Sequence, residues 1–204
     1  LLNEGRLNAA QFSLYQKHVH YTVQVLENMK NIQPQIIHIV QNHCEYIDGS
    51  GYPNKIKGSQ IYLASQIISL AAFYELNSSP RDVSQAISPN KTLDIINKNK
   101  GKKFSEELVE SFVQAIGIYP TGTLVQLDNG EIAVIVETKS KQQQNFRLRP
   151  DIMVLRDNMD EKNNQHKVVE LSSTNNKLKI IQSLPVGTHG IDLTEINNAV
   201  FKYN

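Results

Sequence analysis

The sequence has a single cysteine, Cys44, and no tryptophan. One cysteine cannot form an internal disulfide, and it cannot build a cysteine-rich zinc site. Long apolar runs are missing too, since none approaches the roughly 20 residues that cross a bilayer. No secretory signal is visible. These absences predict a cytoplasmic protein that does not act in a membrane.

An excess of charge of one sign is also missing. Lysine and arginine number 21 against 20 aspartates and glutamates, and the halves on either side of Tyr119 are each close to neutral. No basic block is present to hold a nucleic-acid polymer or an anionic membrane surface, so we expect neither as a partner. A few local cations still suffice to bind a small anionic ligand.

The residues that are present predict a folded chain, with 40% apolar residues to build a core. Up to about residue 118, apolar side chains recur at spacings of three and four, which is typical of helices. Asn8 followed by Gln11 predicts a capping box at the start of the first helix. The predicted helix starts are Asn8, Pro34, Ser59, Ser88-Pro89 and Ser105.

The pattern changes in the second part of the chain. Thr123–Leu127 and Glu131–Glu137, joined by Asp128-Asn129-Gly130, predict a β-hairpin. Further short strands are predicted at 146–149, 152–155, 168–171 and 178–181. We therefore predict a mainly α chain, with a helical domain over 1–118 and a small β-rich subdomain over 119–204.

Two histidines lie on helix faces that we expect to point into the core. His18 borders the apolar stripe of the first helix, and His43 lies on the apolar face of the second. Such histidines can meet inside a bundle and share a metal ion. Each can equally be an ordinary hydrogen-bonded core histidine, and spacing alone favours that interpretation. His20 and His38 are expected at the surface.

Between the second and third helices the sequence runs Asp48-Gly49-Ser50-Gly51-Tyr52-Pro53, which predicts a turn-rich loop. This run, after a histidine-bearing helix, resembles the signature of HD-GYP domains, a branch of the HD metal-dependent phosphohydrolases that cleaves cyclic di-GMP. The resemblance continues in Lys57-Gly58, in Ala86-Ile87-Ser88-Pro89 and in residues 117–125. It implies an HD-type helical bundle ahead of the β-rich part.

The resemblance implies metal ligands, of which only some are kept. His18 matches the histidine of the family's Lys-His-Pro motif, and His43 matches the first histidine of its His-His-Glu motif. Cys44 stands at the second histidine of that motif, and Ala72 stands where the family has an aspartate. The His-Asp dyad that names the superfamily belongs upstream of Leu1.

These departures weaken the expected metal site. Two ions about 3.5–4 Å apart would generate a hydroxide nucleophile and neutralise the phosphate oxygens. Alanine supplies no charge to hold a cation, and cysteine suits zinc better than the harder iron or manganese. We expect either no metal or an incomplete site for divalent Fe, Mn or Zn, and no catalytic residues. The residual ligand candidates are His18, His43 and Cys44.

The resemblance also implies a nucleotide site and a protein-contact surface. The family's Gly-Tyr-Pro tyrosine and the basic residues after its third helix lie near the bound cyclic di-GMP, which makes Tyr52 and Arg81 candidates, with Lys57 nearby. Ser84 stands where the family often has a second basic residue. The loop is implied to contact a diguanylate cyclase (GGDEF) domain. Its candidate residues are Asp48, Gly49, Gly51, Tyr52 and Pro53.

Three functional hypotheses follow from the sequence. The leading one is a degenerate HD-GYP module of bacterial cyclic di-GMP signalling that acts by nucleotide or protein binding. The second is an active metal-dependent cyclic di-GMP phosphodiesterase, with missing ligands supplied upstream of Leu1 or by Cys44 and water. The third is a structural domain that forms a homodimer and binds neither metal nor nucleotide.

Overall fold

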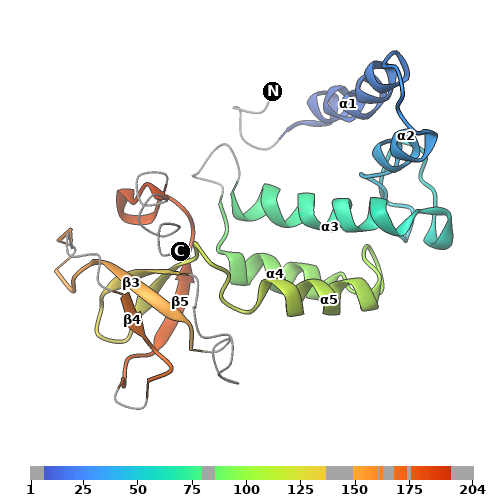
Figure 1. Cartoon of the computed structure of the whole chain (residues 1–204). Coiled ribbons are helices and arrows are strands. Elements are labelled where there is room, and N and C mark those ends of the chain that lie inside the picture. Colours follow the sequence, from blue (N-terminus) through green and yellow to red (C-terminus); the bar gives the residue numbers. More distant parts are fainter. Residues whose placement is uncertain are drawn as a thin grey trace. The chain divides into compact units, whose positions relative to one another are not determined.

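The computed structural model describes residues 7–79, 86–136, 149–159, 161–162, 168–173 and 176–193. The chain divides into two compact units, and Figure 1 shows the helices and the sheet that they contain. The units are Leu1–Leu76 with Asp94–Phe112, and Asn77–Leu93 with Val113–Asn204. The domain boundary after residue 118 stays a prediction.

The predicted helices are present in the described part of the chain. They are α1 (Ala9–Glu27), α2 (Pro34–Gln41), α3 (Leu63–Ser78), α4 (Pro89–Lys98) and α5 (Glu106–Ile116). The capping box forms as predicted, because the Gln11 N–H donates to the Asn8 side chain and the Asn8 N–H donates to the Gln11 side chain, both at 2.9 Å. Ser105 caps α5 by accepting the Leu108 N–H at 3.4 Å. No helix of this part is both long and apolar enough to cross a membrane.

The third helix begins later than predicted. Ser59 lies in the short 3-10 helix η1 (Gly58–Gln60), and α3 starts only at Leu63. Ile61, expected inside the helix, has an extended backbone and a side chain that is 2% exposed. The apolar side chain is therefore buried by leaving the helix, and this tertiary packing outweighs the helical spacing of the sequence.

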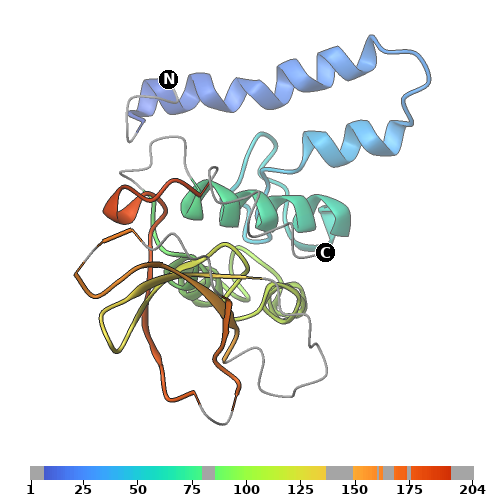
Figure 2. The same cartoon turned by 60° about the vertical axis from the view of Figure 1, so that its left-hand side comes forward.

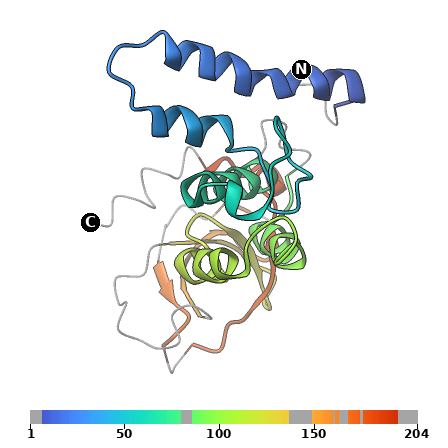
Figure 3. The ribbon, with the colours of Figure 1, turned by 90° about the vertical axis from the view of Figure 1, so that its right-hand side faces the viewer.

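Small polar side chains let α3 pack closely on the end of α2. The hydroxyl of Ser65 donates to the Ile39 carbonyl at 3.1 Å, and that of Ser69 donates to the Glu45 carbonyl at 3.3 Å. Both serines are buried. In Figures 2 and 3, α1 and α2 form a helical hairpin. The segment after α2 is thus fixed by α3.

The sheet is antiparallel and has the strand order β4-β3-β2-β1-β5. Its strands are β1 (Leu124–Leu127), β2 (Ile132–Ile135), β3 (Asp151–Arg156), β4 (Val168–Glu170) and β5 (Ile180–Leu184). The predicted hairpin is confirmed, with Val125 opposite Ala133. The strands predicted at 152–155 and 168–171 are confirmed as β3 and β4.

Two strand predictions differ from the structure or lie beyond it. The strand predicted at 178–181 begins only at Ile180, because the Leu178 N–H donates to the side chain of Asn176 and not to a neighbouring strand. Most of the strand predicted at 146–149 lies outside the described residues, and Arg149 itself belongs to no strand.

Both faces of the sheet are apolar. Because successive side chains on a strand point to opposite faces, the continuous apolar run of β2 supplies both. One face carries Leu124, Ile132, Val134, Val136, Met153, Leu155 and Ile191. The other face carries Val125, Leu127, Ala133, Ile135, Ile152, Val154 and Leu171.

The loop after α2 is held by a buried carboxylate. Glu45 is 1% exposed, and its Oε1 accepts the N–H groups of Asn54 at 2.6 Å and Lys55 at 2.9 Å. The Tyr52 N–H donates to the Cys44 carbonyl at 3.1 Å. The loop therefore folds back onto the residues that end the second helical segment.

This fold-back requires glycine at position 51. A Cβ built on Gly51 would lie 2.5 Å from the Cys44 carbonyl oxygen and 2.5 Å from the Glu45 Cα. Those atoms belong to the main chain, which cannot swing aside as a side chain can. Any side chain at this position must therefore push the loop away from residues 44–46.

The base of the loop is fixed to the segment ahead of α5. The Ile47 N–H donates to the Lys103 carbonyl at 3.1 Å. Beside this bond the ring of Tyr46 packs edge-on against Phe104, which packs against Phe73 of α3, with centroid separations of 5.5 and 5.4 Å. These contacts place the loop against two helical segments.

We expect Gly51→Ala to lower the free energy of unfolding by about 2 kcal/mol or more, because the added methyl group overlaps main-chain atoms. The exposed neighbour Ser50 provides the control, since Ser50→Ala keeps the N–H that donates to Asp48 and should change stability by less than about 0.5 kcal/mol. Urea unfolding followed by circular dichroism at the helix band measures both. Equal urea midpoints for the two variants would show that the folded-back loop does not require glycine at position 51.

Candidate metal centre

Three side chains that the sequence singled out as metal ligands meet in the first unit. His18 comes from α1, and His43 and Cys44 follow α2. One donor atom from each lies within 4.8 Å of the other two. The imidazole centroids are 5.5 Å apart, and the Cys44 Sγ lies 3.9 Å from the His18 Nε2. The two imidazoles therefore lie edge-on to each other between the two helical segments.

Main-chain carbonyls set the tautomers of both histidines. The Nδ1 of His18 lies 2.7 Å from the Tyr15 carbonyl oxygen, and the Nδ1 of His43 lies 2.6 Å from that of Val40. A carbonyl only accepts, so each Nδ1 carries a hydrogen and each Nε2 keeps its lone pair in the neutral ring. A metal-ligating histidine has this arrangement, with its other ring N–H donated to a carbonyl. The same bonds would also satisfy an ordinary core histidine, so the proximity of the Cys44 sulfur is what points to a metal ion.

Cys44 is half-buried and lies beside the Tyr52 hydroxyl. Burial raises the pKa of the Cys44 thiol above its ordinary value, the hydrogen bond with Tyr52 opposes that rise, and the charge of Glu45 adds to it. Burial and the same hydrogen bond raise the pKa of Tyr52. Both groups are therefore neutral at pH 7, and a bound cation is what would draw the thiol to its thiolate.

Tyr52 forms a wall of this cluster. Its ring meets Phe12 edge-on at a centroid distance of 5.8 Å and meets His18 edge-on at 6.3 Å. With its hydroxyl hydrogen-bonded to Cys44, the side chain is directed inward from the loop. These contacts support a packing role for Tyr52.

The three donors, all within 4.8 Å of one another, could gather around one ion that accepts nitrogen and sulfur ligands. In a tetrahedral zinc site with ordinary bond lengths, a sulfur and a nitrogen ligand lie about 3.6 Å apart. The 3.9 Å between the Cys44 Sγ and the His18 Nε2 is close to that separation. Two imidazoles with a thiolate suit zinc better than iron or manganese.

A two-ion centre would need further ligands beside these three. Within the described part of the chain no carboxylate joins the cluster. Residues 65, 69 and 72 share one face of α3, and Ser65 and Ser69 contact the residues leading into the cluster. Ala72 stands at the next turn of that face, so this position offers no carboxylate to a metal ion.

The other predicted site residues are more scattered. Arg81 and Ser84 lie outside the described residues. Lys57 is exposed, and its aliphatic stem covers Gly49, since a Cβ on that glycine would lie 2.5 Å from the Lys57 Cε. In the loop, Asp48 and Pro53 are exposed, while Gly51 is buried. Only part of the predicted contact loop is thus available to a partner.

Sequence reasoning missed the role of Glu45. It is buried, it anchors the loop through two N–H groups, and it adjoins the cluster at Cys44. The available signal was its position directly after the two ligand positions, where it matches the glutamate of the family's His-His-Glu motif. A glutamate there that reaches the loop cannot be told from a surface glutamate by spacing.

A family model described as an HD domain matches residues 1–108, more than half of the chain. A cyclic di-GMP phosphodiesterase of Pseudomonas aeruginosa is 28% identical over 138 residues, which cover 67% of this chain and 33% of the relative. A 3'3'-cGAMP-specific phosphodiesterase of Vibrio cholerae is 30% identical over 111 residues, covering 54% of this chain and 21% of the relative.

A third relative, the cyclic di-GMP phosphodiesterase PdeB of Borreliella burgdorferi, is 23% identical over 161 residues, covering 76% of this chain and 41% of the relative. The chain therefore spans between about a fifth and two fifths of the length of these relatives. The matched residues include the loop and the histidine-cysteine cluster. With a family model over more than half its length and relatives of this kind, the chain belongs to the HD domain family, in its HD-GYP branch.

Proposed function

We propose that this chain is part of an HD-GYP module of bacterial cyclic di-GMP signalling that acts by binding and does not hydrolyse the nucleotide. The donor set at the candidate metal centre carries the proposal. It holds two imidazoles and a thiol, with Ala72 on the helix face that would have to supply a carboxylate. The relatives' names place the family in cyclic-dinucleotide metabolism.

Charge explains why this donor set does not support diester cleavage. A two-metal centre binds the attacking and the leaving oxygen at once, and it requires anionic ligands to keep two divalent cations close together. His18 and His43 are neutral as ligands, and Cys44 contributes at most one negative charge. A second cation near the first would therefore be repelled without compensation.

A single ion fits a structural role better. Held by His18, His43 and Cys44, it would tie α1 to the segment after α2 and add its binding free energy to folding. The loop that carries Tyr52 packs on the same cluster. The ion would thereby stabilise the surface that the loop presents.

Two observations favour protein binding as the main activity. The exposed part of the loop, which includes Asp48 and Pro53, is available to a partner such as a diguanylate cyclase domain. On α1 the large apolar side chains of Leu14, Tyr21 and Val25 are exposed. A helix face of this kind is normally covered, either by a partner such as a second copy of the chain or by other residues of a longer protein.

The purified protein should bind no more than one transition-metal ion per chain, and zinc in preference to iron or manganese, because the donors are soft and carry little charge. Elemental analysis after incubation with each metal and desalting measures this. Cys44→Ser should lose the zinc. His20→Gln, which changes an exposed histidine of α1, the helix that carries His18, should keep the zinc. Two firmly retained ions per chain would contradict the proposal.

We expect no hydrolysis of cyclic di-GMP, or of its linear product, above the rate of a metal-stripped control. The double variant Cys44→His with Ala72→Asp should retain more manganese than Cys44→His alone, because it restores a carboxylate to α3. Product analysis by chromatography and metal analysis provide the two readouts. Turnover by the unaltered protein that a chelator abolishes would show that the centre is active.

Calorimetric titration with cyclic di-GMP separates a nucleotide receptor from a module that binds only proteins. If nucleotide is bound, Arg81→Ala should weaken binding at least tenfold, because the guanidinium fork is the strongest phosphate ligand among the candidates. Lys91→Ala, an exposed charge on α4, serves as the control. Heat of binding that is unaffected by Arg81→Ala would place the nucleotide elsewhere.

A further inference from the structure

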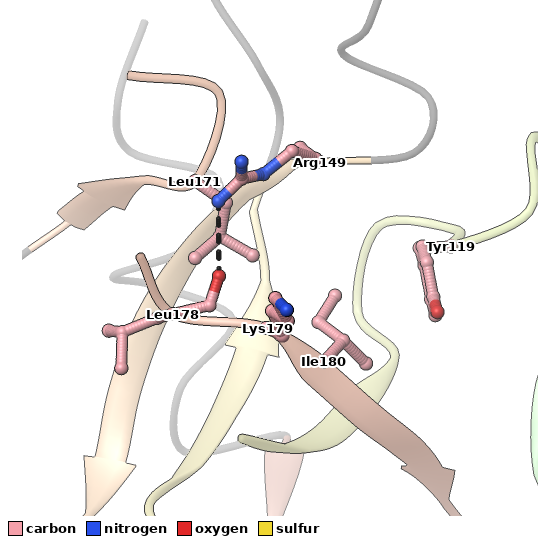
Figure 4. A pocket seen from close by; sticks show the side chains of 6 residues that line it. All are labelled: Tyr119, Arg149, Leu171, Leu178, Lys179 and Ile180. Carbon is pink, nitrogen blue, oxygen red and sulfur yellow. Dashed lines mark hydrogen bonds between the residues drawn. The ribbon is translucent and has the colours of Figure 1, made fainter. Parts of the chain in front are cut away.

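A pocket in the β-rich unit belongs to none of the sites described above. It has a volume of about 310 Å³ and opens beside β5 (Figure 4). Its lining residues are Tyr119, Arg149, Leu171, Leu178, Lys179 and Ile180. All six belong to the second compact unit, whereas the histidine-cysteine cluster belongs to the first. The pocket thus needs an explanation independent of the metal centre.

The wall of the pocket is apolar and rests on the sheet. Leu171 is buried within one of the two apolar clusters of the sheet, and Tyr119, Leu178 and Ile180 pack against that cluster. Figure 4 shows Lys179 and Ile180 between Leu178 and the ring of Tyr119. An apolar wall with one aromatic ring suits the flat, weakly polar body of a small ligand.

Arg149 supplies a fixed cation. Its Nη2 donates to the carbonyl oxygens of Asn176 at 3.0 Å and Leu178 at 3.1 Å, and Figure 4 shows the second of these bonds. A guanidinium has five N–H donors, so three remain. Among the described residues no carboxylate pairs with this side chain. A guanidinium held in place with free donors is suited to bind a phosphate or carboxylate.

Lys179 supplies a second cation. Its main chain is fixed, because its N–H donates to the Asp128 Oδ1 at 3.1 Å and its carbonyl accepts the Asp128 N–H at 2.9 Å. Its ammonium group has no partner among the described residues. Asp128 offsets part of the positive charge, which leaves an excess of one cation where Arg149 and Lys179 meet the apolar wall.

We propose that this pocket binds a nucleoside monophosphate, with its phosphate on Arg149 and Lys179 and its base against Tyr119 and the apolar wall. The volume lies at the lower end of small-molecule sites, which suits a mononucleotide better than a dinucleotide. The proposal requires both ends of the ligand. A free phosphate lacks the body that fills the apolar part, and a nucleoside lacks the charge that satisfies the cations.

Calorimetry of the intact protein with guanosine monophosphate tests the proposal, with guanosine and inorganic phosphate as partial ligands. The monophosphate should bind more tightly than either, and its affinity should fall as salt is added. Lys179→Ala should weaken binding of the monophosphate about fivefold and leave guanosine unchanged. Tyr119→Leu should weaken binding of the monophosphate and of guanosine, because the stacking of the base on the tyrosine ring is lost.

Lys177→Ala is the matched control, since Lys177 is exposed two residues from Lys179 and does not line the pocket. Circular dichroism shows whether each variant is folded. Arg149→Lys is used because alanine would leave two carbonyl groups without their donor, whereas lysine keeps the positive charge. It should weaken binding of the monophosphate and leave binding of guanosine unchanged. The proposal is wrong if millimolar monophosphate does not bind, if phosphate binds as tightly, or if Lys177→Ala and Lys179→Ala have equal effects.

Discussion

The buried carboxylate of Glu45 is the interaction on which the first unit depends. A carboxyl group in the interior is costly unless hydrogen bonds compensate it. The Oε1 of Glu45 accepts two main-chain N–H groups of the loop, whereas its Oε2 is buried without a hydrogen-bond partner among the described residues. The same residue accepts the Ser69 hydroxyl through its carbonyl, which joins α3 to the loop. By holding the loop, Glu45 sets Tyr52 against Cys44 and His18. The loop signature and the histidine-cysteine cluster are therefore parts of one structure.

That coupling gives a physical meaning to the two departures from the family pattern. Cys44, at the position of a family histidine, still offers a donor atom to a metal ion, but sulfur is a softer ligand than nitrogen. The Tyr52 hydroxyl supplies a hydrogen bond to this sulfur atom. Ala72 carries no charge, and it stands on a helix face that also carries the small side chains of Ser65 and Ser69.

Local signals in the sequence were sufficient for most of the secondary structure. The capping box of Asn8 was predicted because its partners are three residues apart, and the hairpin because its turn is short. The start of α3 was wrong because burial of Ile61 is decided by distant residues. Spacing left open whether His18 and His43 meet, and their tautomers depend on main-chain carbonyls that spacing does not locate. The pocket was missed altogether, since Arg149 is held there by carbonyl groups 27 and 29 residues further along the chain.

The strand order has a consequence for the edges of the sheet. In the described part of the chain the sheet ends at β4 and β5, and only such outer strands leave main-chain groups open to pairing with another chain. β4 is three residues long, which gives an added strand little to bind. β5 has five residues, with the Ile181 side chain exposed, so β5 is the edge at which self-association by strand addition would begin.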